Sequence, residues 1–206
     1  MATVTALEVK AARHPLVRLF LDGRYAFSLE PGVAVGLRVE QQLTESEITG
    51  LQRTNEKQRA LASAFRSLAN RPRSSREIRQ KLYRNKFDEQ TVEAAVGELT
   101  AGGLLDDAAF ARYWCENRDS FRPRSSRLIT AELRGKGIDA DTAAGAISEV
   151  DDEAGALRAA AKKVKTLGGA DRETFFRRLG DYLKRRGYNY EIIQKTVREL
   201  WQKQRT

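Results

Sequence analysis

The chain has 206 residues, of which 41% are hydrophobic and 32% are charged. It can therefore bury one core or several small ones beneath an unusually polar surface. Its 37 lysines and arginines exceed its 28 acidic residues and give a net charge of +9, which predicts a polyanionic partner or a partner with an acidic surface. No run of about 18 apolar residues occurs and the first residues do not resemble a secretory signal, so we expect no membrane helix and a cytoplasmic protein.

The sequence offers few of the side chains on which enzymes and metal sites depend. Cys115 is the only cysteine and His14 the only histidine, which argues against an intrachain disulfide, a cysteine-based metal cluster and most Ser-His-Asp chemistry. The acid pairs Asp106-Asp107 and Asp151-Asp152 fit helix caps better than catalytic carboxylates. We therefore expect a protein with no catalytic residues, no cofactor and no metal.

The first fifty residues have the pattern of a small β region that leads into a helix. Asp22-Gly23 lies between two apolar runs and is typical of a hairpin turn, because both turn residues favour positive φ. The apolar residues of 33–39 alternate at period two, which suggests a further extended segment. Thr44 and Glu47 have the spacing of a capping box, so a helix is expected to begin there.

From about Thr54 onward the sequence is helical and repeats with a period of about 50 residues. The motif Arg-Pro-Arg-Ser-Ser-Arg at 71–76 recurs at 122–127, and a fainter third copy follows. Each copy divides into three helices with apolar residues at helical spacing. The first helices are expected at 56–69, 107–119 and 153–167, the second at 74–85, 125–136 and 173–186, and the third at 89–101, 140–149 and 190–203.

The second helix of each copy has recognisable ends. Hydroxyl residues suited to N-capping lie near the three starts: Ser74, Ser125 and Thr174. Gly137 and Gly187 follow two of the helices, where a left-handed glycine commonly terminates a helix. Lys86 occupies that place in the first copy, so its turn is expected to be strained or closed differently.

Three helices with a short turn before the last are close to a helix-turn-helix unit. The expected fold is mainly α, with three tandem three-helix repeats in an elongated, curved array after a small N-terminal β-hairpin region. Each repeat should bury its own core, with Leu82, Leu133 and Leu183 at equivalent places. No heptad seam is evident, so a monomer is expected. The expected domains are residues 1–53, 54–105, 106–151 and 152–206.

Positive charge is concentrated in and just before each second helix. Residues 71–86, 118–136 and 172–186 carry net charges of +6, +4 and +4, so the rest of the chain is net acidic. A solvated helix face normally mixes its signs, whereas this charge is one-signed and periodic, which suits DNA phosphates or a protein filament. The candidate binding residues are Arg71, Arg73, Arg76, Arg79, Arg84, Lys86, Arg122, Arg124, Arg127, Arg134, Lys136, Arg177, Arg178, Lys184, Arg185 and Arg186.

Some of these arginines flank the serine caps, where a phosphate or an acidic side chain of a partner could bind. They are Arg73, Arg76, Arg124 and Arg127. The alternative is that they merely pair with nearby acids such as Glu77 and Glu132. Exposed pairs of that kind contribute only about 0–1 kcal/mol to stability.

The order and spacing of several segments resemble the RecX family, regulatory proteins that act on the RecA recombinase. The segments are Asp22-Gly23-Arg24-Tyr25, residues 73–82, Gly103-Leu104-Leu105-Asp106-Asp107 with Phe110-Ala111, residues 132–138 and residues 183–188.

The resemblance implies that the protein binds along the groove of the filament formed by RecA on single-stranded DNA. There it would bridge neighbouring subunits and lower the ATPase, strand-exchange and co-protease activities of RecA in recombination, DNA repair and the SOS response. The alternative is a sequence-nonspecific DNA-binding protein of helix-turn-helix type that binds single- or double-stranded DNA directly. Third helices such as 89–101 are acidic or neutral, which favours the filament over base reading.

Overall fold

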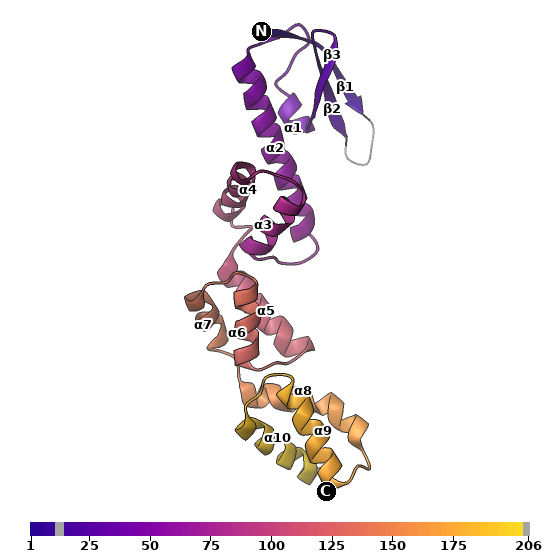
Figure 1. The fold of residues 1–206 in the computed structure, drawn as a ribbon, viewed down its shortest axis with the longest axis vertical. Coiled ribbons are helices and arrows are strands. Elements are labelled where there is room, and N and C mark those ends of the chain that lie inside the picture. Colours follow the sequence, from indigo (N-terminus) through magenta and orange to yellow (C-terminus); the bar gives the residue numbers. More distant parts are fainter. Residues whose placement is uncertain (11–14, 204–206) are drawn as a thin grey trace. The chain divides into compact units, whose positions relative to one another are not determined.

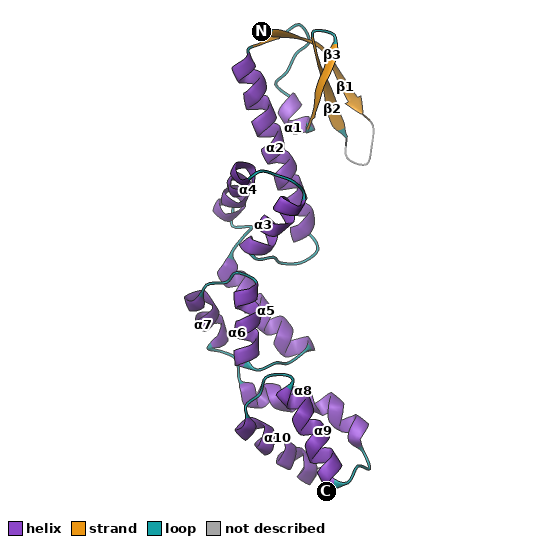
Figure 2. Ribbon diagram, in the orientation of Figure 1, coloured by secondary structure: helices purple, strands orange, loops and turns teal. Residues whose placement is uncertain are grey.

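Strands occur only in the N-terminal part of the described residues, and helices dominate from residue 45 onward (Figure 2). The computed structural model describes residues 1–10 and 15–203, so His14 lies outside the described residues. The chain divides into two units, residues 1–105 and residues 106–206 (Figure 1). These observations confirm the mainly α fold with a small N-terminal strand region. No helix in the described segments has both the length and the apolar character needed to cross a membrane.

The N-terminal sheet has four antiparallel strands in the order β3-β2-β1-β4. As expected, Asp22 and Gly23 form the turn between β2 and β3, with φ angles of 48° and 76°. The buried side chains of the sheet form one small core with residues of the following helix. The strands are β1 (Ala2–Lys10), β2 (Leu16–Leu21), β3 (Arg24–Leu29) and β4 (Gln42–Leu43).

The alternating segment 33–39 is not a strand, contrary to the sequence-based expectation. Residues Pro31–Ala34 form the short helix α1, with Pro31 at its first turn, and turns follow until β4. Proline suits that position because its φ is already helical and the missing N–H has no role there. Val33 and Leu37 pack against the N-terminal core whereas Val35 and Val39 are exposed, so the four residues do not share one face as they would in a strand.

Helix α2 (Glu45–Leu68) joins the sheet to the first repeat. Thr44 and Glu47 cap it reciprocally, as the spacing predicted: the Thr44 side chain accepts from the Glu47 N–H and the Glu47 carboxylate accepts from the Thr44 N–H. The expected boundary after residue 53 falls inside this continuous helix. Asn55 is buried at that point and bonds the end of β3, accepting from the Glu30 N–H at 2.7 Å and donating to the Ser28 carbonyl at 3.0 Å.

Each repeat is a bundle of three helices with its own core. Leu82, Leu133 and Leu183 are completely buried in three separate cores, as the repeat alignment predicted. The bundles consist of α2 with α3 (Ser75–Arg84) and α4 (Glu89–Ala101); α5 (Asp107–Phe121), α6 (Ser126–Gly135) and α7 (Ala140–Ile147); and α8 (Asp152–Val164), the 3₁₀ turn η1 (Lys165–Leu167), α9 (Arg172–Lys184) and α10 (Tyr190–Lys203).

The turns that end the second helices have the left-handed conformation that the sequence predicted. Gly137 and Gly187 have φ angles of 84° and 90°, and Lys86 adopts 69° at the same place. A lysine in this region carries a small steric cost that glycine avoids. The first repeat therefore accepts mild backbone strain in order to keep the same turn.

In the second unit, polar contacts link the start of α6 to the third repeat. The Arg186 carbonyl accepts from the Ser125 N–H at 3.0 Å. The Asp152 carboxylate accepts from both the N–H and the hydroxyl of Ser126, at 2.6 and 2.9 Å. Asp151, which precedes it, caps α8 as expected, and Asp106 caps α5 in the same way. Of the two adjacent acids, Asp151 therefore caps a helix and Asp152 joins the second repeat to the third.

Candidate binding surface on the second helices

Helices α3 and α6, the second helices of the first and second repeats, begin alike because the shared motif places a serine at each N-cap. The side chains of Ser74 and Ser125 accept hydrogen bonds from the N–H groups of Glu77 and Leu128, at 3.2 and 3.3 Å. The third differs from the expectation: Asp171 is the cap, and it accepts from the Thr174 N–H at 2.9 Å. A carboxylate is an equally strong N-cap, and its position three residues earlier lengthens α9.

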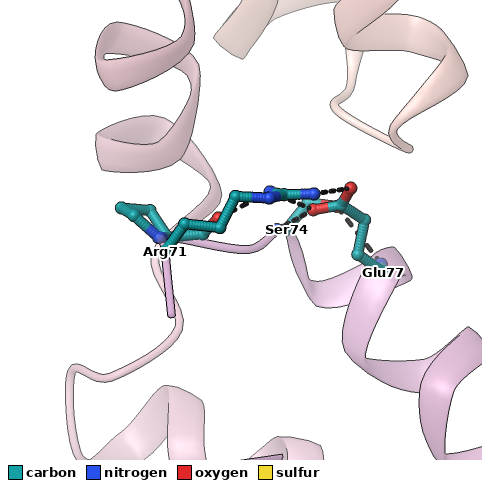
Figure 3. A network of polar contacts seen from close by, with 4 residues as sticks. Arg71, Ser74 and Glu77 are labelled. Atoms are coloured by element: carbon teal, nitrogen blue, oxygen red, sulfur yellow. Dashed lines mark hydrogen bonds and ion pairs between the residues drawn. The ribbon is translucent and has the colours of Figure 1, made fainter. Parts of the chain in front are cut away.

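In the first repeat, two candidate arginines are bound to glutamates of the chain. The Arg71 guanidinium forms a two-pronged contact with the Glu77 carboxylate, at 3.0 and 2.8 Å. Figure 3 shows Arg71 reaching from the loop to Glu77, with Ser74 beside them. Arg79 forms a similar contact with Glu93 of α4, at 2.8 and 3.0 Å. Both guanidinium groups are therefore committed to acids of the chain.

In the second repeat, the carboxylate of Glu132 accepts hydrogen bonds from several side chains. Glu132 accepts from Arg118 Nε at 2.7 Å and from Trp114 Nε1 at 2.8 Å, and it also binds Arg124. Burial by itself would raise the pKa of Glu132, but the hydrogen bonds from Arg118 and Trp114 and the charges of Arg118 and Arg124 outweigh it. The pKa of this carboxyl therefore lies below its ordinary value, and the group stays ionised at neutral pH.

Two further candidates lie over aromatic rings. The Lys136 ammonium is 4.1 Å from the ring centre of Trp114. In the third repeat, the Arg186 guanidinium is 3.8 Å from the ring centre of Tyr182. Such cation–π contacts hold the charge against the surface of the protein and reduce its freedom to engage a partner.

The remaining candidates, except Arg73 and Arg84, are exposed, and their side chains form no hydrogen bond or ion pair with any described residue. They are Arg76, Lys86, Arg122, Arg127, Arg134, Arg177, Arg178, Lys184 and Arg185. Arg84 is also exposed, but its Nε donates to the Gln80 carbonyl of its own helix at 3.3 Å. Arg73 is half-buried and lines a cavity of the first repeat.

Three of the exposed arginines occupy the same place in the three repeats. Arg76, Arg127 and Arg177 each lie six residues before the buried leucine of their second helix. We refer to these three residues as the arginine triplet. Their side chains share helix, register and exposure, so each repeat presents one uncommitted guanidinium at an equivalent position.

The sequence-based candidates omitted Arg118, which binds Glu132 in the second repeat. Trp114 and Arg118 are four residues apart on α5, and that spacing places them on one helix face, where the guanidinium lies 4.3 Å from the ring centre. Cys115 lies between them in the sequence but faces the core, and burial raises the pKa of its thiol to about 11. Cys115 is thus a core residue rather than a reactive thiol.

Comparison with known proteins matches all three repeats to one family. Models of the first, second and third three-helix domains of RecX match residues 60–99, 106–147 and 151–197. The chain is 40% identical over 142 residues to the regulatory protein RecX of Amycolatopsis mediterranei (strain U-32), covering 66% of this chain and 81% of that protein. It is 28% identical over 206 residues to the regulatory protein RecX of Clostridium botulinum (strain Alaska E43 / Type E3), covering 97% of this chain and 96% of that protein.

Solved structures share the same fold. A crystal structure of regulatory protein RecX superposes with a TM-score of 0.70 at 20% identity, covering 95% of this chain and 98% of that one. RecX from Lactobacillus salivarius gives a TM-score of 0.61 at 19% identity, covering 71% of this chain and 97% of that one. The matched three-helix domains, the identity to named relatives and the common fold agree, and the chain belongs to the RecX family of regulatory proteins.

Proposed function

We propose that this chain binds the filament of RecA on single-stranded DNA and restrains the activities of RecA. The observation that carries the proposal is the arginine triplet, which recurs once in each of three domains that match the RecX family. A filament offers the same subunit at regular intervals, so a chain that repeats one basic contact can engage several subunits or phosphates together. Such linked contacts strengthen binding far beyond the affinity of any one of them.

The restraint would follow from this multivalent binding. A chain that bridges neighbouring subunits opposes the movements that accompany ATP turnover, and it lowers ATPase, strand-exchange and co-protease activity together. The chain acts as a monomer in the cytoplasm and needs no catalytic residue or cofactor of its own, because binding free energy alone shifts the population of filament states.

Direct, sequence-nonspecific binding of DNA by a helix-turn-helix unit is the competing function, and the contacts within the first repeat disfavour its third helix as the DNA-binding or base-reading element. Two acids of α4 are held by cations of the other two helices: Glu93 by Arg79, and Glu98 by Lys57 at 2.9 Å. A recognition helix needs donors and acceptors free to face base edges, and a negative helix is repelled by phosphates.

The test compares binding to three immobilised targets at one salt concentration: the RecA filament, naked single-stranded DNA and naked double-stranded DNA. The proposal expects the filament to be bound at least about tenfold more tightly than either DNA, together with a dose-dependent loss of RecA ATPase activity. Equal affinity for filament and naked DNA, with the ATPase rate unchanged, would instead favour the DNA-binding function.

A further inference from the structure

The first repeat contains a polar cavity of about 360 Å³ between the end of α2 and the face of α3. Its basic lining residues are Arg73, Lys81 and Arg84. One carboxylate, that of Glu77, also borders it, but Glu77 is already engaged by both terminal nitrogens of Arg71. The cavity therefore has an excess of positive charge.

Arg73 is the residue in this cavity that most needs a partner. Its Nε is buried and has no hydrogen-bond partner among the described residues. A buried donor of a charged group left without a partner is costly, and proteins normally satisfy such groups. An anion that entered the cavity would balance the charge of the Arg73 guanidinium.

The second repeat shows how the same place is filled when the chain supplies the anion. At the 51-residue offset, Arg124 corresponds to Arg73, and Glu132 corresponds to Lys81. Glu132 places its carboxylate against Arg124 and against Arg118, which corresponds to Ser67 of the cavity lining. The second repeat therefore satisfies its arginine internally, whereas the first repeat has a lysine where the acid would be.

The third repeat fills the corresponding place with an aromatic ring. Tyr182 lies at the position of Lys81 and Glu132, one residue before the buried leucine, and it carries Arg186 over its face. In the first repeat, by contrast, the basic side chains of Arg73, Lys81 and Arg84 line a cavity at this position.

We propose that the cavity of the first repeat binds an acidic side chain of the partner protein, an aspartate or glutamate of RecA. Its carboxylate would take the place beside Arg73 that the Glu132 carboxylate has beside Arg124. A carboxylate on a slender side chain can enter between two helices, whereas a phosphodiester carries a sugar on either side. This inference rests on the proposed function, since it names the chemistry by which the first repeat recognises RecA.

The test uses a substitution that supplies a carboxylate to the cavity from the chain itself. Lys81→Glu places at this position the residue type of Glu132 in the second repeat. The new carboxylate should pair with Arg73 and so prevent an acidic side chain of RecA from binding there. Lys81→Gln removes the charge without supplying a carboxylate. Arg53→Glu makes the same change in net charge as Lys81→Glu, at an exposed site of α2 outside the candidate surface. Full-length variants are compared for affinity to DNA-free RecA and to a single-stranded oligonucleotide, and their melting temperatures confirm folding.

We expect Lys81→Glu to weaken RecA binding by about tenfold, the value of one charge-assisted contact. We expect Lys81→Gln and Arg53→Glu to weaken it less, and Lys81→Glu to melt above Lys81→Gln because Arg73 has gained a partner. Affinity for the oligonucleotide should change equally in Lys81→Glu and Arg53→Glu.

Two results would overturn the inference while leaving the proposed function intact. One is wild-type affinity of Lys81→Glu for RecA. The other is a loss in Lys81→Glu confined to the oligonucleotide and larger than in Arg53→Glu, which would assign the cavity to a phosphate. Failure of the wild-type chain to bind both DNA-free RecA and the RecA filament would overturn the proposed function and, with it, the named partner.

Discussion

Each of the three buried leucines lies in the core of its own repeat. Leu133 is completely buried in the core of the second repeat, so Leu133→Ala removes a large apolar contact and leaves a cavity. We expect a loss of about 2–5 kcal/mol in the free energy of unfolding, measured by urea denaturation. Leu104→Ala is the control, because Leu104 is 54% exposed and its truncation should change stability by less than about 0.5 kcal/mol. Equal effects of the two substitutions would contradict the repeat alignment.

Glu132 gives the second repeat a dependence on pH. Its pKa is lowered in the folded chain, so its contribution to stability is complete above the ordinary carboxyl pKa and is lost as the pH falls through the lowered value. We expect Glu132→Gln to cost about 1.5–3 kcal/mol at pH 7. The difference between variant and wild type should shrink from about pH 5 downward, as measured by urea denaturation across the acid range. A difference that stays constant down to pH 2 would exclude this ion cluster as its source.

The pairing of individual arginines could not be predicted from the sequence. The motif is identical in the first two repeats, yet Arg71 binds Glu77 while its counterpart Arg122 pairs with no described residue, and Arg124 binds Glu132 while its counterpart Arg73 pairs with no described acid. The difference arises from residues outside the motif: the second repeat has Leu128 where the first has Glu77, and its acid lies one turn later. The structure was therefore needed to separate the cations that bind acids or aromatic rings of the chain from the arginine triplet.

At the scale of elements, Gly187 couples the second and third repeats. It has a φ angle of 90°, and a Cβ there would lie 2.5 Å from Ser125 Oγ and 3.0 Å from Leu128 Cβ. Gly187→Ala should therefore force α6 away from the turn and lower the melting temperature of the chain. Gly169→Ala is a matched control, because Gly169 has a φ of 80° but nothing within 4 Å of an added Cβ.

We expect Gly169→Ala to cost about 1–2 kcal/mol from backbone strain alone and Gly187→Ala to cost clearly more. Calorimetry of both variants measures the difference. Equal losses would mean that the close approach of Gly187 to α6 contributes nothing to stability.

Element boundaries were predictable where local chemistry decides them and not where tertiary packing does. Caps and turn glycines placed most helix ends within a few residues, because those signals act within one turn. The boundary expected after residue 53 falls inside α2, since Asn55 ties the middle of that helix to the sheet. Period-two alternation misled at 33–39 because the segment begins as a helix, and its alternating residues divide between the core and the solvent.

At the scale of the whole molecule, the proposed binding is electrostatic and shared among the repeats. Each cation that neutralises a phosphate or an acid releases counterions, so the affinity for the filament should fall steeply with salt. We expect a loss of at least about tenfold between 50 and 200 mM salt, measured by fluorescence anisotropy of a labelled filament. An affinity independent of salt would remove the electrostatic basis of the proposal.

The contribution of the arginine triplet to filament binding can be measured by replacing all three residues at once. The affinity for the RecA filament is measured at one salt concentration for the wild-type chain, for Arg76→Ala with Arg127→Ala and Arg177→Ala, and for a control with the same loss of charge. The control replaces three exposed cations of the N-terminal half, Lys10, Arg24 and Arg53, by alanine. We predict that the triplet variant loses at least about tenfold in affinity and its inhibition of RecA ATPase, while the control stays within about twofold. Equal affinities for the two variants would contradict the claim that the second helices form the binding surface.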